Sequence, residues 1–180
     1  MAMALSVPLY TVDDLDHFPD DGNRYELLDG VLLVTPQASA PHQIVANRIQ
    51  TELAISLQKT GLAHVVGPGA VIQMPRTQLQ PDILVYPARF SPTTDWRQLT
   101  EHWLAVEVFS RSSRIYDRDF KRDAYLALGV QQVWLVDWHE RFVEVCTGNR
   151  KSSEVSDLIR SRIGGVEVVI DLPEVFSGLE

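Results

Sequence analysis

The chain has 180 residues, 45% of them hydrophobic and 22% charged, which predicts one globular domain with ample core over residues 1–180. Its net charge of −8 argues against binding nucleic acid through a wholly basic surface. The start lacks the basic segment of a signal peptide, no stretch is apolar enough to span a bilayer, and the single cysteine, Cys146, cannot form an internal disulfide, so we expect a cytoplasmic protein with no membrane contact.

The N-terminal third predicts a short helix and a β-hairpin. Residues 11–17 read as a helix capped by Thr11, with acidic side chains in its first turn. Residues 24–34 read as a hairpin that turns at Asp29 and Gly30, because this dipeptide favours tight hairpin turns. Glu26 lies on the first arm, where two interpretations stay open: an exposed strand residue or an inward-facing functional one.

Residues 40–60 predict the first long helix. Apolar residues recur every four positions, and Gly61 supplies the C-terminal stop. His42 falls in the first turn, as a surface or packing residue or as a catalytic one.

Three short apolar runs follow, at 62–66, 70–74 and 82–86, and predict β-strands. Gly67–Gly69 separates the first two, and a polar turn is expected at 75–79 before the third. Asp82 directly precedes the apolar part of the third run. The loop at 87–102 then leads to the next strand and is expected to rim a site.

Residues 103–109 predict a buried strand that contains Glu107. Neither face of this strand is polar, so the carboxylate should meet a cation or strong donors, unless it leans out at a strand end or pairs with an arginine. Asp82, at the start of a neighbouring strand, needs a cation or strong donors for the same reason. Two carboxylates about 4 Å apart would repel by roughly 4 kcal/mol at an effective dielectric near 20. A divalent cation would remove this conflict, and Mg²⁺ typically binds through one or two carboxylates.

After residues 110–113 the sequence predicts a helix that ends at Gly129, with Phe120, Ala124 and Leu128 as its buried stripe. Lys121 either forms a surface pair with Asp117 or places its ammonium over the Glu107 strand. Further strands are expected at 133–137, 142–146 and 166–170, the last closing an edge of the fold. This order of elements suits an α/β domain with a central mixed sheet and helices against it.

Positive charge gathers in one segment. Residues 111–122 hold five basic side chains against two acidic ones, a local charge of +3 that leaves −11 for the rest of the chain. The segment lies beside the expected carboxylate site. It is either a contact surface for phosphate groups or a solvated helix face.

The pairing of Pro81-Asp82 with Glu107 in VEVFS resembles the PD-(D/E)XK nuclease superfamily. The ordered set YELLDG, the His42 helix, QPD, VEVFSRSS, YDRDFKRDAY and GVQQVWLVD resembles the bacterial Uma-type family more closely, a group formerly classed as a domain of unknown function. The resemblance runs from about Arg24 to Val145. It implies a restriction-endonuclease-like fold with an N-terminal β-hairpin.

The resemblance also implies roles for particular residues. Asp82 and Glu107 would hold Mg²⁺, with Mn²⁺ able to substitute, and Glu26 would add a ligand through water. The superfamily places a lysine where Phe109 stands, whereas the Uma-type pattern has it on the following helix, where Lys121 fits with Asp117 and Tyr125 flanking it. The remaining candidate residues, expected to contact phosphate or nucleic acid, are His42, Arg111, Arg114, Arg118 and Arg122.

The function that these residues predict is metal-dependent hydrolysis of phosphodiester bonds in nucleic acid, most simply DNA, by a homodimer. Lys121 would support the phosphate electrostatically. The main alternative is a nuclease-like binding or assembly module that has lost turnover, which the missing lysine at position 109 and the acidic surface favour. A metal-dependent phosphodiesterase acting on small substrates is a third hypothesis.

Overall fold

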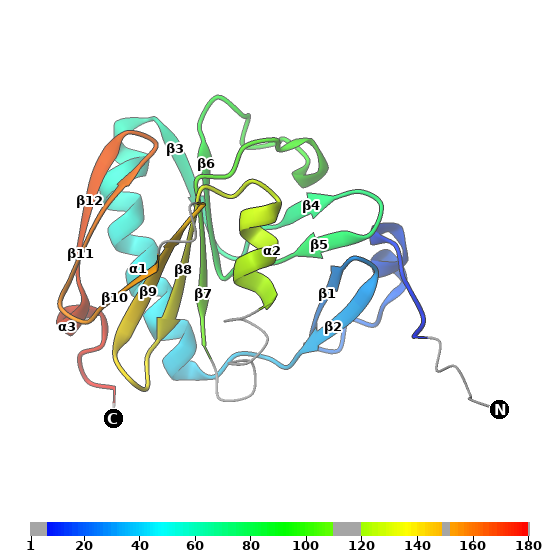
Figure 1. The fold of residues 1–180 in the computed structure, drawn as a ribbon, viewed down its shortest axis with the longest axis horizontal. Helices are drawn as coiled ribbons and strands as arrows, with labels where there is room; N and C mark the ends of the chain where they lie inside the picture. The colour runs from blue at the N-terminus through cyan, green and yellow to red at the C-terminus, as the bar shows by residue number, and fades with distance from the viewer. Residues whose placement is uncertain (1–6, 110–119, 149–151, 180) are drawn as a thin grey trace.

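The computed structural model describes residues 7–109, 120–148 and 152–179 (Figure 1). The helices are α1 (Ala40–Leu57), α2 (Arg122–Ala127) and α3 (Leu172–Val175), and the 3₁₀ turns are η1 (Val12–His17), η2 (Gln58–Thr60) and η3 (Trp96–Gln98). The strands are β1 (Arg24–Leu28), β2 (Val31–Thr35), β3 (Ala63–Val66), β4 (Val71–Gln73), β5 (Thr77–Leu79), β6 (Ile83–Pro87), β7 (Leu104–Val108), β8 (Gln132–Asp137), β9 (Phe142–Thr147), β10 (Ser152–Val155), β11 (Leu158–Ile163) and β12 (Val166–Asp171).

The strands form a central sheet and two smaller ones. The central sheet has the order β10-β9-β8-β7-β6-β3, in which β7 and β8 run parallel and the other neighbours antiparallel. A second sheet has the order β2-β1-β5-β4, and β11 pairs with β12 alone. The predicted α/β architecture with a central mixed sheet is therefore confirmed.

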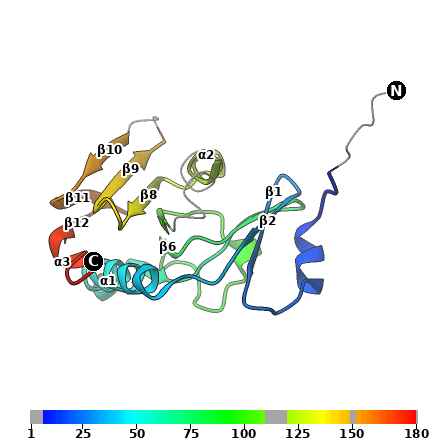
Figure 2. The ribbon, with the colours of Figure 1, turned by 90° about the horizontal axis from the view of Figure 1, so that it is seen from below.

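Helices α1 and α2 cover opposite faces of the central sheet (Figure 2). Because side chains alternate along a strand, β6 and β7 supply both layers. Ile83 and Val106 pack toward α1, whereas Leu84 and Ala105 pack toward the side of α2. None of the helices in the described residues is both long and apolar enough to cross a membrane.

Helix α1 agrees with the sequence pattern. Its predicted apolar stripe is completely buried, at Val45, Ile49, Leu53 and Leu57. The segment ends through η2 at Gly61, whose left-handed φ of 71° favours glycine. The C-terminal hairpin β11–β12 packs on α1 (Figure 1), so it covers the helix instead of extending an edge of the central sheet.

The N-terminal hairpin turns at the predicted dipeptide. Asp29 and Gly30 have φ values of 51° and 86°, as a type I′ turn requires. The pairing Glu26↔Leu33 fixes the register of β1 against β2. In this register Glu26 is completely buried, which decides in favour of the inward-facing interpretation.

The polar turn expected at 75–79 is only partly confirmed: residues 74–76 form a turn, but residues 77–79 form β5. Thr77 and Leu79 are buried while Gln78 pairs with Leu27 on one side and Ile72 on the other. A segment of three residues is too short to show clearly the alternation of buried and exposed side chains that indicates a strand. Its polar composition therefore suggested a turn.

The buried stripe expected on the second helix is also wrong. Phe120 is 55% exposed, and the buried residues are Lys121 and Tyr125, one position further along. Ala124 and Leu128 are only partly buried. A helical pattern read from apolar residues alone excludes a lysine from the core, yet this lysine is buried because it has carboxylate partners.

The turn between β11 and β12 allows a matched stability test. Both Gly164 and Gly165 have positive φ, but a Cβ at Gly164 would collide with the ring of Trp103, whereas a Cβ at Gly165 meets nothing within 4 Å. We expect Gly165→Ala to lower the free energy of unfolding by about 1 kcal/mol through backbone strain. Gly164→Ala should cost about 1–3 kcal/mol more through overpacking. Urea denaturation of both variants measures the difference, and equal losses would contradict the contact with Trp103.

Candidate active site

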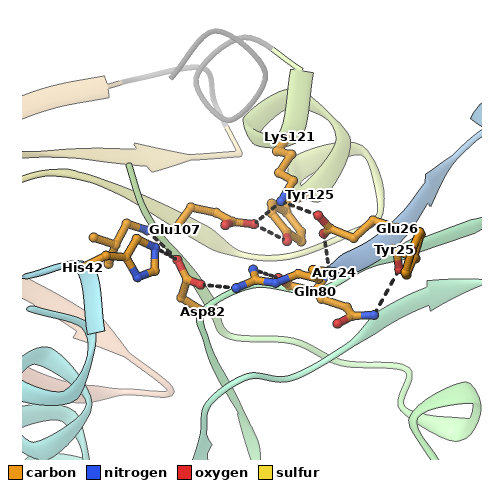
Figure 3. Close-up of polar contacts among 10 residues, drawn as sticks. Arg24, Tyr25, Glu26, His42, Gln80, Asp82, Glu107, Lys121 and Tyr125 are labelled. Carbon is orange, nitrogen blue, oxygen red and sulfur yellow. Dashed lines mark hydrogen bonds and ion pairs between the residues drawn. The ribbon is translucent and has the colours of Figure 1, made fainter. Parts of the chain in front are cut away.

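Three carboxylates from three strand segments meet at the junction of the central and second sheets (Figure 3). Asp82 immediately precedes β6, Glu107 lies on β7, and Glu26 lies on β1. The side chains that accompany them include Arg24 from β1, His42 from α1, and Lys121 and Tyr125 from α2 and the turn before it.

The register of β6 and β7 brings Asp82 and Glu107 together. Ile83 pairs with Val106, so one step further along this antiparallel ladder Asp82 lies opposite Glu107. Directly opposed residues point to the same face, with Cβ atoms about 5 Å apart. The backbone N–H of Val108 donates to Asp82 Oδ2 at 2.8 Å and fixes the end of this rung.

Donors surround the buried carboxylate of Asp82. Arg24 Nη2 lies 2.8 Å from Oδ1, and His42 Nε2 lies 3.1 Å from Oδ2. Burial acts to raise the pKa of Asp82, but the hydrogen bond and charge of His42, the charge of Arg24 and the hydrogen bond from Val108 lower it from 3.8 to about 2. Asp82 is therefore ionised at neutral pH.

Lys121 joins the other two carboxylates. Its Nζ lies 2.8 Å from Glu26 Oε2 and 3.3 Å from Glu107 Oε1, and all three side chains are at most 4% exposed. The hydroxyl of Tyr125 donates to Glu107 Oε1 at 2.6 Å. The backbone N–H of Gln80 donates to Glu26 Oε1, also at 2.6 Å. These contacts hold the ammonium at a defined point between two sheets.

Arg24 is affected by the whole acidic group. Burial acts to lower its pKa, but Asp82, Glu107 and Glu26 together raise it above its usual value. Its Nη1 also donates to the backbone oxygen of Gln80 at 2.9 Å. Three carboxylates thus face the cationic side chains of Arg24 and Lys121, and His42 lies beside Asp82.

Five of the predicted site residues lie in this one cluster: Glu26, His42, Asp82, Glu107 and Lys121. Arg122 lies apart from them. Its side chain bonds Asp123 at 2.8 Å and approaches Glu144 of β9 at 3.8 Å. The other expected phosphate contacts, Arg111, Arg114 and Arg118, lie outside the described residues, as does Asp117.

Sequence reasoning missed Arg24 and gave Tyr125 no function. Arg24 is two residues before Glu26, so the same strand alternation that turned Glu26 inward could have placed Arg24 beside it. Tyr125 follows Lys121 by one helical turn, which puts both on one face of α2. No sequence signal links His42 to Asp82, because that contact depends on how α1 packs on the central sheet.

The donors suit a hard divalent cation in type, although several already have protein partners. Asp82 and Glu107 supply carboxylate oxygens on one rung, and Mg²⁺ commonly uses one or two carboxylates completed by water. Across residues 7–109, 120–148 and 152–179, no three His, Cys, Asp or Glu side chains group closely enough to hold a metal ion. In the described residues Glu26 pairs with Lys121 Nζ at 2.8 Å.

Comparison with known proteins gives a family and a fold. The family described as "Uma2: Putative restriction endonuclease" matches residues 12–180. The crystal structure of "a putative nuclease belonging to DUF820" from Anabaena variabilis superposes with a TM-score of 0.76 at 16% identity, over 93% of this chain and 97% of that one. No curated protein shows significant similarity.

The lowered pKa of Asp82 makes stability depend on pH. Because the folded value of about 2 lies below the ordinary 3.8, ionised Asp82 stabilises the fold above pH 3.8, and this stabilisation is lost as the pH falls toward 2. We expect a contribution of about 2 kcal/mol at pH 5 and about 1 kcal/mol at pH 3. Urea denaturation of the wild type and Asp82→Asn in EDTA should show their stability difference narrowing over this range. A difference that does not vary with pH would contradict the pairing of Asp82 in the folded state.

Proposed function

The chain belongs to the Uma2 family, described as putative restriction endonucleases, and on this premise we propose that it is a metal-dependent endonuclease that hydrolyses phosphodiester bonds in DNA. The main support is the rung shared by Asp82 and Glu107, with the Lys121 ammonium 3.3 Å from Glu107. Two opposed carboxylates and an adjacent amine supply the charges that phosphoryl chemistry uses.

Asp82 and Glu107 would hold the divalent cation, Mg²⁺ with Mn²⁺ as a substitute. When bound, such an ion lowers the pKa of coordinated water and neutralises charge on the phosphate. Residues of the chain orient this pair: Val108 N–H and His42 fix Asp82, and Tyr125 fixes Glu107. Glu26 acts on Lys121, since it pairs with the ammonium and accepts a hydrogen bond from Gln80 N–H.

Lys121 would stabilise negative charge on the reacting phosphate. Lys121 is 3% exposed, and a charge in a buried site acts on its neighbours more strongly than one in water. Glu26 and Glu107 hold the amine within the cluster, at 2.8 and 3.3 Å from its nitrogen. The lysine missing from position 109 is thus supplied from the start of α2, which reaches the same end of β7.

The proposed substrate and assembly rest on the charge pattern of the sequence. An acidic chain with one basic segment would bind nucleic acid locally, through that segment, and DNA is the simplest substrate. Cleavage of both strands would call for a symmetric homodimer that presents two such sites.

One observation favours the alternative, a nuclease-like module that binds without turnover. Both oxygens of Asp82 already accept hydrogen bonds or ion pairs, from Arg24, His42 and Val108. A carboxylate occupied in this way can serve structure alone. Mn²⁺ binding without cleavage of single-stranded, duplex or branched DNA would identify the module.

Glu107→Gln should abolish most cleavage while the domain stays folded. Loss of an outer-shell partner at a metal site costs about 10–100-fold in activity, so loss of a ligand should cost on the order of 100-fold or more. Glu140→Gln, on the exposed β8–β9 turn, serves as the matched control. Cleavage of labelled DNA in Mg²⁺ or Mn²⁺ measures the rates, and circular dichroism checks the fold. Wild-type cleavage by Glu107→Gln would refute the assignment.

Lys121→Met should lower the rate without weakening the binding of the metal. Removal of a positive charge beside the reacting phosphate is expected to reduce kcat on the order of 100-fold. The buried carboxylates of Glu26 and Glu107 lose their shared partner, so the free energy of unfolding should also fall by about 3–5 kcal/mol. Single-turnover cleavage, Mn²⁺ calorimetry and urea denaturation measure the three quantities, with exposed Lys59→Met as the control. An unchanged kcat would exclude Lys121 from the chemistry.

A further inference from the structure

Arg24 lies where its charge opposes that of a bound metal ion. Its guanidinium is 2.8 Å from Asp82 Oδ1, and the side chain is only 21% exposed. A second bond, from Nη1 to the backbone oxygen of Gln80 at 2.9 Å, holds the group in place. The chain therefore supplies a cation of its own to the carboxylate that would hold the divalent ion.

The charges around Asp82 show what this resident cation implies. Arg24 and Lys121 already place two cationic side chains among the three carboxylates of the cluster. A divalent ion bound at Asp82 would lie close to the guanidinium of Arg24, and like charges repel more strongly where burial limits screening by water. A phosphodiester, which carries −1, would offset part of this positive charge.

We propose that Arg24 is a resident counter-cation that keeps the affinity for divalent metal low until a phosphodiester arrives, so that metal and nucleic-acid backbone bind together. This inference rests on the proposed function and adds an order of events to it. The metal shares Asp82 with a guanidinium that repels it, and the incoming phosphate removes the excess positive charge. By linkage, the metal strengthens binding of the backbone by the same factor.

A purely structural role for Arg24 predicts the opposite effect. If the guanidinium only positioned Asp82 for the metal, neutral Arg24→Met would bind Mn²⁺ more weakly than the wild type. If the guanidinium competes with the metal, Arg24→Met binds Mn²⁺ more tightly. The sign of the change separates the two roles, and it does not depend on catalysis.

The experiment is Mn²⁺ titration calorimetry on the full chain, with and without phosphorothioate oligonucleotides, single-stranded and duplex, which keep the backbone charge and resist cleavage. Without oligonucleotide, Arg24→Met should bind Mn²⁺ about tenfold more tightly than the wild type, within the usual range for coupled sites. An oligonucleotide should tighten Mn²⁺ binding about tenfold in the wild type and much less in Arg24→Met.

Two further variants control the measurement. Arg24→Lys keeps the positive charge and should resemble the wild type. Arg48→Met removes a guanidinium that bonds the backbone oxygens of Val175 and Ser177, away from the cluster, and should also leave Mn²⁺ binding unchanged.

Several results would overturn the proposal. Equal or weaker Mn²⁺ binding by folded Arg24→Met would do so, even if the wild type cleaves DNA, and the proposed function would then survive. If Arg24→Met does not fold, the titrations of the wild type test the proposal. A wild-type Mn²⁺ affinity that neither oligonucleotide changes would refute the coupling. Absence of Mn²⁺ binding by the wild type under all conditions would refute this proposal and the proposed function together.

Discussion

The buried ammonium of Lys121 is the interaction on which the arrangement of the site depends. It lies within 3.3 Å of carboxylates from two different sheets, Glu26 on β1 and Glu107 on β7. Without a shared cation, two buried carboxylates this close to one another would be forced apart or protonated. The start of α2 is thereby tied to both sheets, and the second sheet is held against the end of the central one.

Arg24 and Asp82 form a second link between the same two sheets. The two links differ in what surrounds them. Lys121 is enclosed on all sides at 3% exposure, whereas Arg24 keeps about a fifth of its side chain in contact with solvent. Asp82 also accepts a hydrogen bond from Val108 N–H and contacts His42 of α1, so helix, hairpin and two central strands converge on a single carboxylate.

Strong, long patterns in the sequence predicted the fold well. These patterns are the four-residue spacing in α1, the Asp29-Gly30 turn and the apolar strand around Glu107. Each of them can be read within one element, without knowing which other element packs against it. The errors occurred where burial depends on a distant partner. Strand β5 is polar and three residues long, and it is a strand because β1 and β4 flank it. Phe120 is exposed and Lys121 is buried, the opposite of what hydrophobicity predicts, because the lysine has two carboxylate partners.

The same distinction applies to the site. Asp82 and Glu107 could be identified from the sequence, because a carboxylate buried with an apolar strand needs a cation or hydrogen-bond donors in any fold. The sequence did not show which residues would be the partners of Asp82. Arg24 and His42 contact it because β1 and α1 pack against the central sheet. For Glu26 and Lys121 the sequence left two interpretations open and the family resemblance favoured the functional ones, and the structure places their side chains 2.8 Å apart.

The cluster draws its members from positions 24 to 125 of the chain, and this scattering has a consequence during protein synthesis. A ribosome-bound chain that has emerged only as far as β7 contains Glu26, Asp82 and Glu107. It does not yet contain Lys121, whose ammonium pairs with Glu26 and Glu107. The ion pairs that join Glu26 and Glu107 through Lys121 can form only after residue 121 has been synthesised. The complete cluster therefore forms late in synthesis, once Lys121 and Tyr125 can pack against β1 and β7.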